Sequence, residues 1–176
     1  MQRDNRTNRW VVFSHGLESG PWGTKITALA ACAEARGYRV ESIDYRGITD
    51  PGERVARLVD AVAGRITAPI LVGSSMGAHV AAAASRSLDA AGLFLMAPAV
   101  YMRGYETLTP EPAACPMTIV HGWGDDIVPV DNAIRYAQQH RATLHVLDDD
   151  HRLQHRPAHL RALFDDFLVG LERGHP

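Results

Sequence analysis

Short runs of consecutive apolar residues alternate along the chain with longer segments in which apolar residues recur every three or four positions. The short runs predict buried strands, and the longer periodic segments predict helices with one buried face. Strands are expected at 10–13, 38–43, 70–73, 92–96, 117–121 and 142–147, and helices at 24–36, 53–66, 76–87, 130–140 and 157–171. Thr24 resembles the N-cap of the first helix, and Gly37 is expected to close that helix.

This alternation indicates right-handed crossovers that build a parallel sheet covered by helices on both faces. We therefore predict a three-layer α/β/α sandwich with a mostly parallel sheet of about six strands. The chain of 176 residues contains no internal repeat, low-complexity tract or linker. Residues 1–176 are accordingly expected to form a single domain, with a polar N-terminal tail at 1–9.

The most informative stretch is Gly-Ser-Ser-Met-Gly at 73–77, between the third predicted strand and the third predicted helix. Strand, turn and helix around a G-x-S-x-G pattern are typical of a nucleophile elbow, which exposes its central serine above the sheet. The tight turn leaves no room for side chains two positions away, which explains Gly73 and Gly77. Because the pattern is short, a simple turn of small residues is the structural alternative. Only other residues of the chain can distinguish the two interpretations.

Other predicted strands also end in polar residues. The first ends in Ser14-His15-Gly16-Leu17, the fifth in His121 followed by Asp125 and Asp126, and the last in 148–151, Asp-Asp-Asp-His. The carboxyl ends of parallel strands meet at one edge of a sheet, where active sites form. A serine nucleophile needs an imidazole to accept its proton, a carboxylate to orient the imidazole, and N–H donors for the oxyanion.

On these residues the chain resembles the α/β-hydrolase superfamily, in particular its small serine hydrolases without a cap domain. The resemblance rests on the elbow, on His15-Gly16, on the motif His121-Gly122-x-x-Asp125-x-x-Val128-Pro129, and on the order of serine, acid and histidine. It extends from about Trp10 to Leu171. Two departures are evident, because the two leading strands of the family are missing and only about eighteen residues, 99–116, stand where a cap domain is commonly inserted.

The resemblance implies that Ser75 is the nucleophile, Asp125 the acid and His151 the base, with the N–H groups of Leu17 and Met76 forming the oxyanion hole. It implies six parallel strands in spatial order 2-1-3-4-5-6, with a small flap in place of a lid. The expected activity is hydrolysis of carboxylic esters or thioesters of small acyl substrates by water, with no metal or organic cofactor. Amide and lactone hydrolysis would use the same constellation.

Several alternatives are open at this stage. Asp126 is the neighbouring candidate for the acid. His155 and His159 are expected to face solvent on the terminal helix, although the spacing of His151, His155 and His159, together with the three aspartates that precede them, also permits a metal site. A catalytically silent α/β-hydrolase fold that acts as a binding or interaction protein is the alternative function.

Further residues are expected to serve the structure. We expect His15 and His121 to organise loops, His79 to pack beside the sheet, and 44–47, Asp-Tyr-Arg-Gly, to form a structural turn. The residues that are candidates for lining the substrate pocket are Trp22, Tyr101, Met102 and Trp123.

Composition excludes some partners and leaves others open. The formal net charge is −2 and no run of lysine and arginine occurs, so no nucleic-acid partner is expected. The first apolar run is too short for a signal peptide or a membrane span, and the only cysteines are Cys32 and Cys115. A cytoplasmic protein with reduced thiols is therefore expected. The natural substrate and the oligomeric state are not determined by the sequence.

Overall fold

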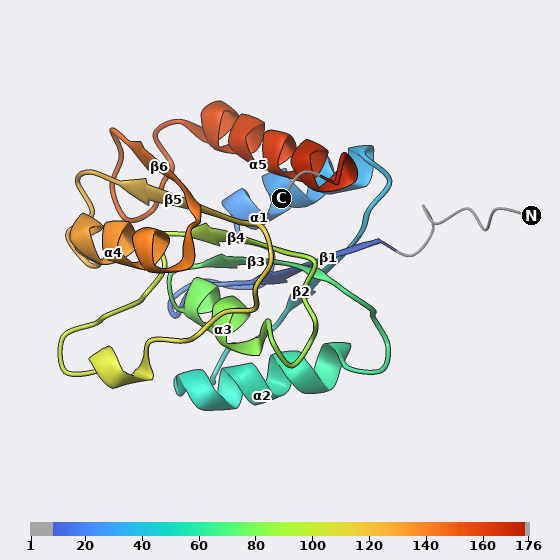
Figure 1. Ribbon diagram of the computed structural model, residues 1–176, viewed down its shortest axis with the longest axis horizontal. Coiled ribbons are helices and arrows are strands. Elements are labelled where there is room, and N and C mark those ends of the chain that lie inside the picture. The colour runs from blue at the N-terminus through green and yellow to red at the C-terminus, as the bar shows by residue number, and fades with distance from the viewer. Residues whose placement is uncertain (1–8, 175–176) are drawn as a thin grey trace, which may run out of the picture.

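The computed structural model describes residues 9–174, and in this part of the chain one sheet of six parallel strands lies between two layers of helices (Figure 1). The strands are β1 (Trp10–Ser14), β2 (Arg39–Ile43), β3 (Ile70–Ser74), β4 (Gly92–Met96), β5 (Met117–Gly122) and β6 (Thr143–Leu147). Their order across the sheet is β2-β1-β3-β4-β5-β6, and every adjacent pair is parallel. The predicted fold class and strand order are confirmed.

The helices divide between the two faces of the sheet (Figure 1). Helices α1 (Thr24–Ala35) and α5 (Pro157–Glu172) cover one face, while α2 (Pro51–Val62), α3 (Met76–Ala84) and α4 (Val130–His140) cover the other. Successive strand residues point to opposite faces. Val12 and Leu71 therefore pack in the core under α2, α3 and α4, whereas Val11 and Val72 pack in the core under α1 and α5.

The predicted N-cap of the first helix and the predicted start of the second helix are wrong. Thr24 is the first helical residue and Gly23 is the N-cap, where no side chain completes the cap. The second helix begins at Pro51, because the Asp50 carboxylate accepts a hydrogen bond from the Glu53 N–H at 2.8 Å and proline fits the first helical turn. Apolar periodicity could not locate this start, since the first turn of α2 carries no buried apolar residue.

The segment between β4 and β5 is irregular apart from a 3₁₀ turn, η1 (Glu106–Leu108). It forms a flap and no cap domain, as predicted.

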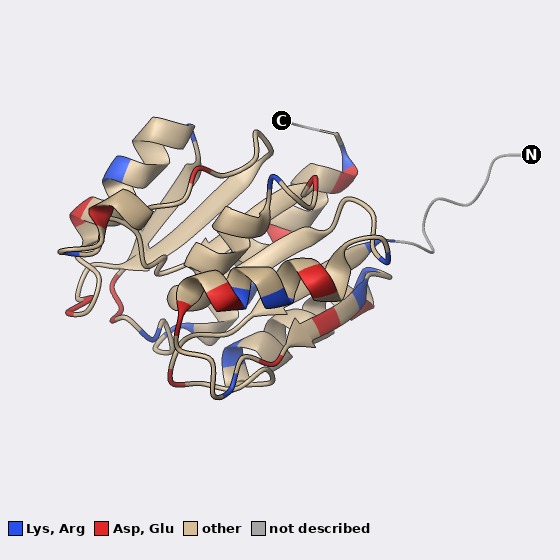
Figure 2. Cartoon of the chain, turned by 90° about the horizontal axis from the view of Figure 1, so that it is seen from below, with Lys and Arg blue, Asp and Glu red and all other residues tan. Residues whose placement is uncertain are grey.

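Acidic and basic residues are interspersed on the outer side of α2, as Figure 2 shows. The predicted polar tail lies outside the described residues, except for Arg9. No helix in residues 9–174 is long and apolar enough to cross a membrane.

Candidate active site

The turn between β3 and α3 has the geometry of a nucleophile elbow. Ser75 has a φ of 56° and a ψ of −119°, an unusual backbone conformation for a residue with a side chain. A Cβ atom on Gly73 would lie 2.3 Å from the carbonyl oxygen of Gly77, and one on Gly77 would lie 2.0 Å from that of Ser14. Both positions therefore require glycine, which excludes the interpretation of this stretch as an ordinary turn of small residues.

Three predicted site residues come together at the carboxyl edge of the sheet. The Ser75 Oγ atom lies 2.9 Å from His151 Nε2, and His151 Nδ1 lies 2.7 Å from Asp125 Oδ2. The Asp125 side chain is fully buried and that of His151 is 13% exposed. Asp126, the alternative acid, is exposed, and the carboxylate that contacts His151 belongs to Asp125.

The Asp125 carboxylate is held in place by its own loop. Its Oδ1 atom accepts hydrogen bonds from the N–H groups of Ile127 at 2.9 Å and Val128 at 2.8 Å. The buried ring of His121 lies beside the other oxygen, with Nε2 3.2 Å from Asp125 Oδ2 and 2.9 Å from the Val128 carbonyl oxygen. Burial lowers the pKa of His121, so the ring is neutral and donates from Nε2. As predicted, His121 organises a loop.

The loop after β1 is fixed by a residue that the sequence did not single out. The Gly16 carbonyl oxygen lies 2.7 Å from His15 Nδ1 and 3.3 Å from Nη1 of Arg54, a fully buried residue of α2. The N–H of Leu17 belongs to the same trans peptide unit and points the opposite way. Arg54 thus orients the donor predicted for the oxyanion hole. The sequence did indicate that Arg54 is buried, because it lies four residues before Leu58 and therefore on the buried face of α2.

The second predicted donor, the N–H of Met76, belongs to the first residue of α3. An N–H at the first position of a helix has no carbonyl partner within that helix, and the helix dipole favours negative charge there. His15 supports the first donor as a neutral ring, because its Nε2 accepts the Tyr45 N–H at 2.9 Å and burial lowers its pKa. The turn at 44–47 therefore has a structural role, as expected.

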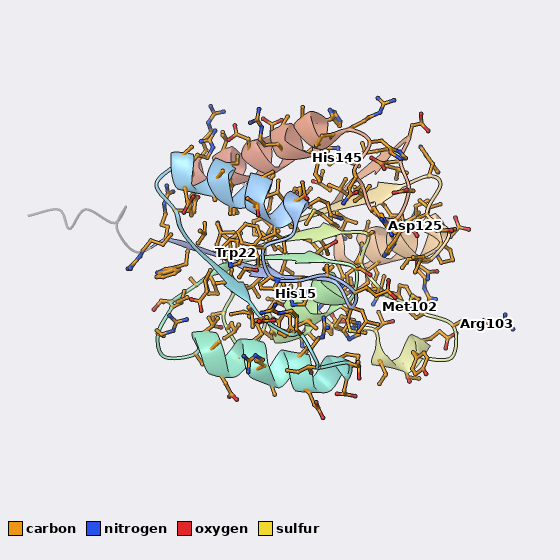
Figure 3. The ribbon with its side chains drawn as sticks, turned by 180° about the vertical axis from the view of Figure 1, so that it is seen from behind. His15, Trp22, Met102, Arg103, Asp125 and His145 are labelled. Carbon is orange, nitrogen blue, oxygen red and sulfur yellow. The ribbon has the colours of Figure 1, made fainter. Side chains whose placement is uncertain are left out.

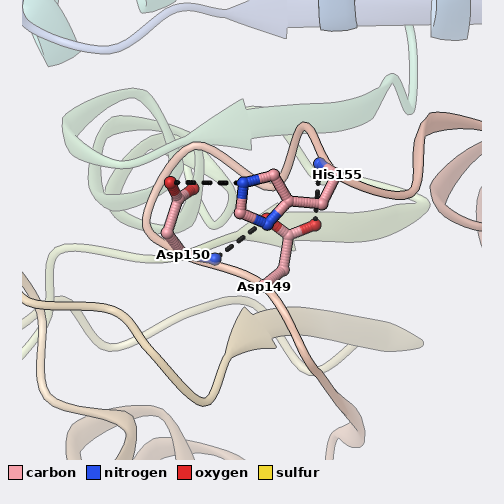
Figure 4. Close-up of side chains that lie close together, drawn as sticks. All are labelled: Asp149, Asp150 and His155. Carbon is pink, nitrogen blue, oxygen red and sulfur yellow. Dashed lines mark hydrogen bonds and ion pairs between the residues drawn. The ribbon is translucent and has the colours of Figure 1, made fainter.

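The loop that carries His151 is braced by three of its own residues (Figure 4). His155 Nδ1 lies 3.2 Å from Asp149 Oδ1, and His155 Nε2 lies 3.9 Å from Asp150 Oδ2. His155 and His159 are both exposed, as predicted, but His155 precedes α5, so the prediction that it belongs to the terminal helix is wrong. Of the residues in the predicted metal alternative, Asp149, Asp150 and His155 form a possible ligand group in residues 9–174, with ligand atoms within 4.8 Å of one another, whereas His151 and His159 are not part of it.

This loop also packs tightly against the loop that carries Asp125. A Cβ atom on Gly122 would lie 2.4 Å from the carbonyl oxygen of Asp149, and the Gly124 N–H donates to the same oxygen at 2.9 Å. The close approach brings the loops of the acid and the imidazole together. From the sequence, Gly122 could be recognised only as part of a motif, and this close contact could not be predicted.

A lysine stands beside the elbow. Lys25, in the first turn of α1, donates a hydrogen bond from Nζ to Ser74 Oγ at 3.1 Å. Burial lowers the pKa of Lys25 to about 8, although the carboxylates of Asp149, Asp150 and Asp125 act in the opposite direction. Lys25 was not among the site residues predicted from the sequence. A signal was available, since Lys25 is the only lysine of the chain.

The candidates for lining the substrate pocket do not form one group. Asp125 and Met102 lie toward the same end of the molecule, whereas Trp22 is set back from that end (Figure 3). The Trp123 side chain is largely exposed, and the Tyr101 hydroxyl donates to Gln139 on α4. Two hollows, of about 1180 Å³ between α1 and α5 and about 710 Å³ beside β5 and β6, contain none of the three residues that form the Ser75–His151–Asp125 chain.

The comparisons with known proteins agree with this architecture. The family model described as "Alpha/beta hydrolase family" matches residues 11–174, and the chain therefore belongs to the α/β-hydrolase family. A crystal structure from Xanthomonas campestris pv. campestris, assigned to the hydrolases of the alpha/beta superfamily, is 32% identical with a TM-score of 0.84. The match covers 93% of this chain and 99% of that one.

More distant structures share the fold. Est1E from Butyrivibrio proteoclasticus is 15% identical with a TM-score of 0.82, over 97% of this chain and 90% of that chain. An α/β serine hydrolase without a lid from Xanthomonas campestris is 22% identical with a TM-score of 0.72, over 99% and 86% of the two chains. No curated protein matches the sequence significantly.

Proposed function

We propose that this protein is a serine hydrolase that cleaves carboxylic esters or thioesters of small acyl substrates through a covalent acyl-enzyme. The observation that carries the proposal is the continuous hydrogen-bonded chain from Ser75 Oγ through the His151 ring to the buried Asp125 carboxylate. These three groups are the parts that a serine nucleophile needs in order to react at neutral pH.

In the first half of the reaction, Ser75 Oγ attacks the substrate carbonyl carbon while His151 Nε2 takes the hydroxyl proton. His151 Nδ1 keeps its proton and donates it in a hydrogen bond to Asp125, which stabilises the imidazolium. The carbonyl oxygen becomes an oxyanion and binds the N–H groups of Leu17 and Met76. Collapse of the tetrahedral intermediate expels the alcohol or thiol, which receives the proton from His151.

In the second half, water takes the place of the leaving group. His151 removes a proton from this water, which attacks the acyl carbon, and the oxyanion forms again in the same hole. When the second tetrahedral intermediate collapses, the proton returns to Ser75 Oγ and the carboxylic acid leaves. The thioester and ester reactions differ only in the leaving group, so the same residues serve both.

A fluorophosphonate probe tests this proposal, since it reacts covalently with an activated serine. We expect stoichiometric labelling of the purified protein at Ser75, no labelling of Ser75→Ala, and turnover of short-chain activated esters and thioesters. A folded protein that neither labels nor turns over any acyl substrate would instead support the catalytically silent binding protein.

A further inference from the structure

The chain contains seventeen arginines and a single lysine, and that lysine lies at the candidate active site. Lys25 is half-buried in the first turn of α1, and its Nζ atom lies 3.1 Å from Ser74 Oγ. Ser74 is the last residue of β3 and immediately precedes Ser75. The ammonium group therefore links α1 to the side chain of the residue that precedes the proposed nucleophile.

The surroundings of Lys25 are acidic, but no carboxylate pairs with it closely. Its charged neighbours are Asp149 and Asp150 in the loop after β6 and Asp125 in the loop after β5. None of them lies within 4.0 Å of Nζ in the described part of the chain, where Ser74 Oγ is the hydrogen-bond partner. The ammonium thus attracts the two loops that carry His151 and Asp125 while it holds the elbow.

We propose that Lys25 is a positioning residue for the reaction, which holds the elbow through Ser74 and draws the loop of His151 toward it. This inference rests on the proposed function, because it concerns how Ser75 and His151 are kept within reach of each other. Lys25 acts through Ser74 and through the field of its charge, and it takes no part in proton transfer.

The positive charge is the active feature of this group. An arginine would carry a charge at every accessible pH, whereas a half-buried lysine can lose its proton. Because burial lowers the pKa of Lys25 to about 8, the group is mostly charged at pH 7 and neutral well above pH 8. The attraction to the carboxylates of Asp149, Asp150 and Asp125 disappears with the charge. Activity should therefore fall as the pH rises through about 8.

The stability of the protein should respond in the opposite direction. Between the folded pKa of about 8 and the ordinary value of 10.5, the unfolded chain binds more protons at Lys25 than the folded chain does. The free energy of unfolding therefore gains a contribution that rises with pH across this window. Below pH 8 both states are charged, and the folded state bears the full cost of burying the ammonium.

The test compares the full-length protein with Lys25→Met, Lys25→Arg, Ser74→Ala and the Lys25→Met/Ser74→Ala double variant. We measure kcat and KM on one neutral short-chain ester from pH 6 to 10, the rate of fluorophosphonate labelling, and the midpoint of thermal unfolding. For Lys25→Met we expect a loss of kcat on the order of tenfold, with little change in KM, because the nucleophile is less well placed. We also expect the alkaline limb of the pH profile, the fall in kcat above about pH 8, to disappear. The midpoint of thermal unfolding at pH 7 should be unchanged or higher.

The other variants separate positioning from a structural role. Lys25→Arg should restore much of kcat and show no alkaline limb near pH 8, because the charge persists. Ser74→Ala should lower kcat less than Lys25→Met does. The double variant should have a kcat no lower than that of Lys25→Met alone, because the two residues act through one contact. Equal kcat and pH profiles for Lys25→Met and the unaltered protein would overturn the inference, as would an alkaline limb near pH 8 that survives in Lys25→Met.

Failure of the proposed function gives a different result. If the unaltered protein neither labels nor hydrolyses the ester, the proposed function fails and this inference falls with it. If the unaltered protein labels and hydrolyses, and Lys25→Met does so at the same rates across the pH range, only the inference about Lys25 fails.

Discussion

Hydrogen bonds fix the backbone of Ser75 on both sides of its strained φ angle. Its N–H donates to the Met96 carbonyl at 2.9 Å, and its carbonyl accepts the N–H of Ala78 at 3.0 Å and that of Ala99 at 3.2 Å. Contacts with the end of β4 and the start of α3 therefore hold the strained backbone of Ser75 in place. They do not use the Ser75 side chain, which stays free to react. Only one of the two adjacent serines is presented in this way, since Ser74 is still part of β3.

Replacing each serine by alanine should consequently have very different effects. We expect Ser75→Ala to abolish turnover and labelling, because the proposed nucleophile is removed. Ser74→Ala should keep a substantial fraction of kcat, because it loses only the contact with Lys25. Steady-state kinetics on the same activated ester measure both. An inactive Ser74→Ala variant beside an active Ser75→Ala variant would mean that the nucleophile has been assigned to the wrong serine.

Asp125 and Asp126 offer a second matched pair. Asp125→Asn should keep the fold but favour the wrong tautomer of His151, with a loss of kcat of roughly 10⁴, as in protease triads. Asp126→Asn should have little effect, because the Asp126 side chain is exposed to solvent. Circular dichroism checks that both variants are folded, and kcat ranks them. The reverse ranking would move the proposed acid by one position.

At the scale of elements, the site depends on how closely the loops after β5 and β6 approach each other. The sequence could supply the strands, their alternation with helices and the polar residues at their ends, because these follow from hydrophobic periodicity. It could not supply the contact of Gly122 with Asp149 or the hydrogen bond by which Arg54 holds the Gly16 carbonyl. Those features depend on tertiary packing between segments far apart in the chain.

The contact at Gly122 leads to a prediction about both activity and stability. A Cβ atom at this position would meet the Asp149 carbonyl oxygen at 2.4 Å, so Gly122→Ala must push the two loops apart. We expect a loss of roughly 1–3 kcal/mol in the free energy of unfolding, as for other overpacked sites, together with a lower kcat. Urea unfolding and steady-state kinetics measure the two effects.

Gly170, on α5, is the matched control, because a Cβ added there meets no atom within 4 Å beyond its chain neighbours and the backbone of its own helix. Gly170→Ala should leave kcat unchanged and raise the free energy of unfolding by about 0.5–1 kcal/mol, as glycine is costly inside a helix. A Gly122→Ala variant with unaltered stability and kcat would show that the approach of the two loops does not matter to the site.

At the scale of the whole molecule, the strand order and the absence of a cap domain could be predicted from the resemblance to the α/β-hydrolase superfamily and from the short segment at 99–116. The expectation of a single domain stays a prediction. The flap between β4 and β5 could be predicted as irregular, but its attachments could not. Three hydrogen bonds connect the flap to α4: one from the Tyr101 hydroxyl to Gln139, one from Asn132 to the Val100 carbonyl and one from the Tyr136 hydroxyl to the Pro110 carbonyl. The Ala113 N–H donates to Ser85 Oγ, just beyond α3.

Because the flap is attached at both ends, we expect that it does not open and close over the site as a lid does. Lids exclude water and supply contacts to remote parts of a substrate, so without one the affinity for any small ester should be modest. We therefore predict hydrolysis of short-chain activated esters with ordinary saturation kinetics, little activity on long-chain triglyceride emulsions, and no activation at a lipid–water interface. Rates measured across the solubility limit of a sparingly soluble ester test this directly. A sharp increase in rate at that limit would mean that the flap moves as a working lid, and in that case weakening its attachment by Tyr101→Phe should change the size of the increase.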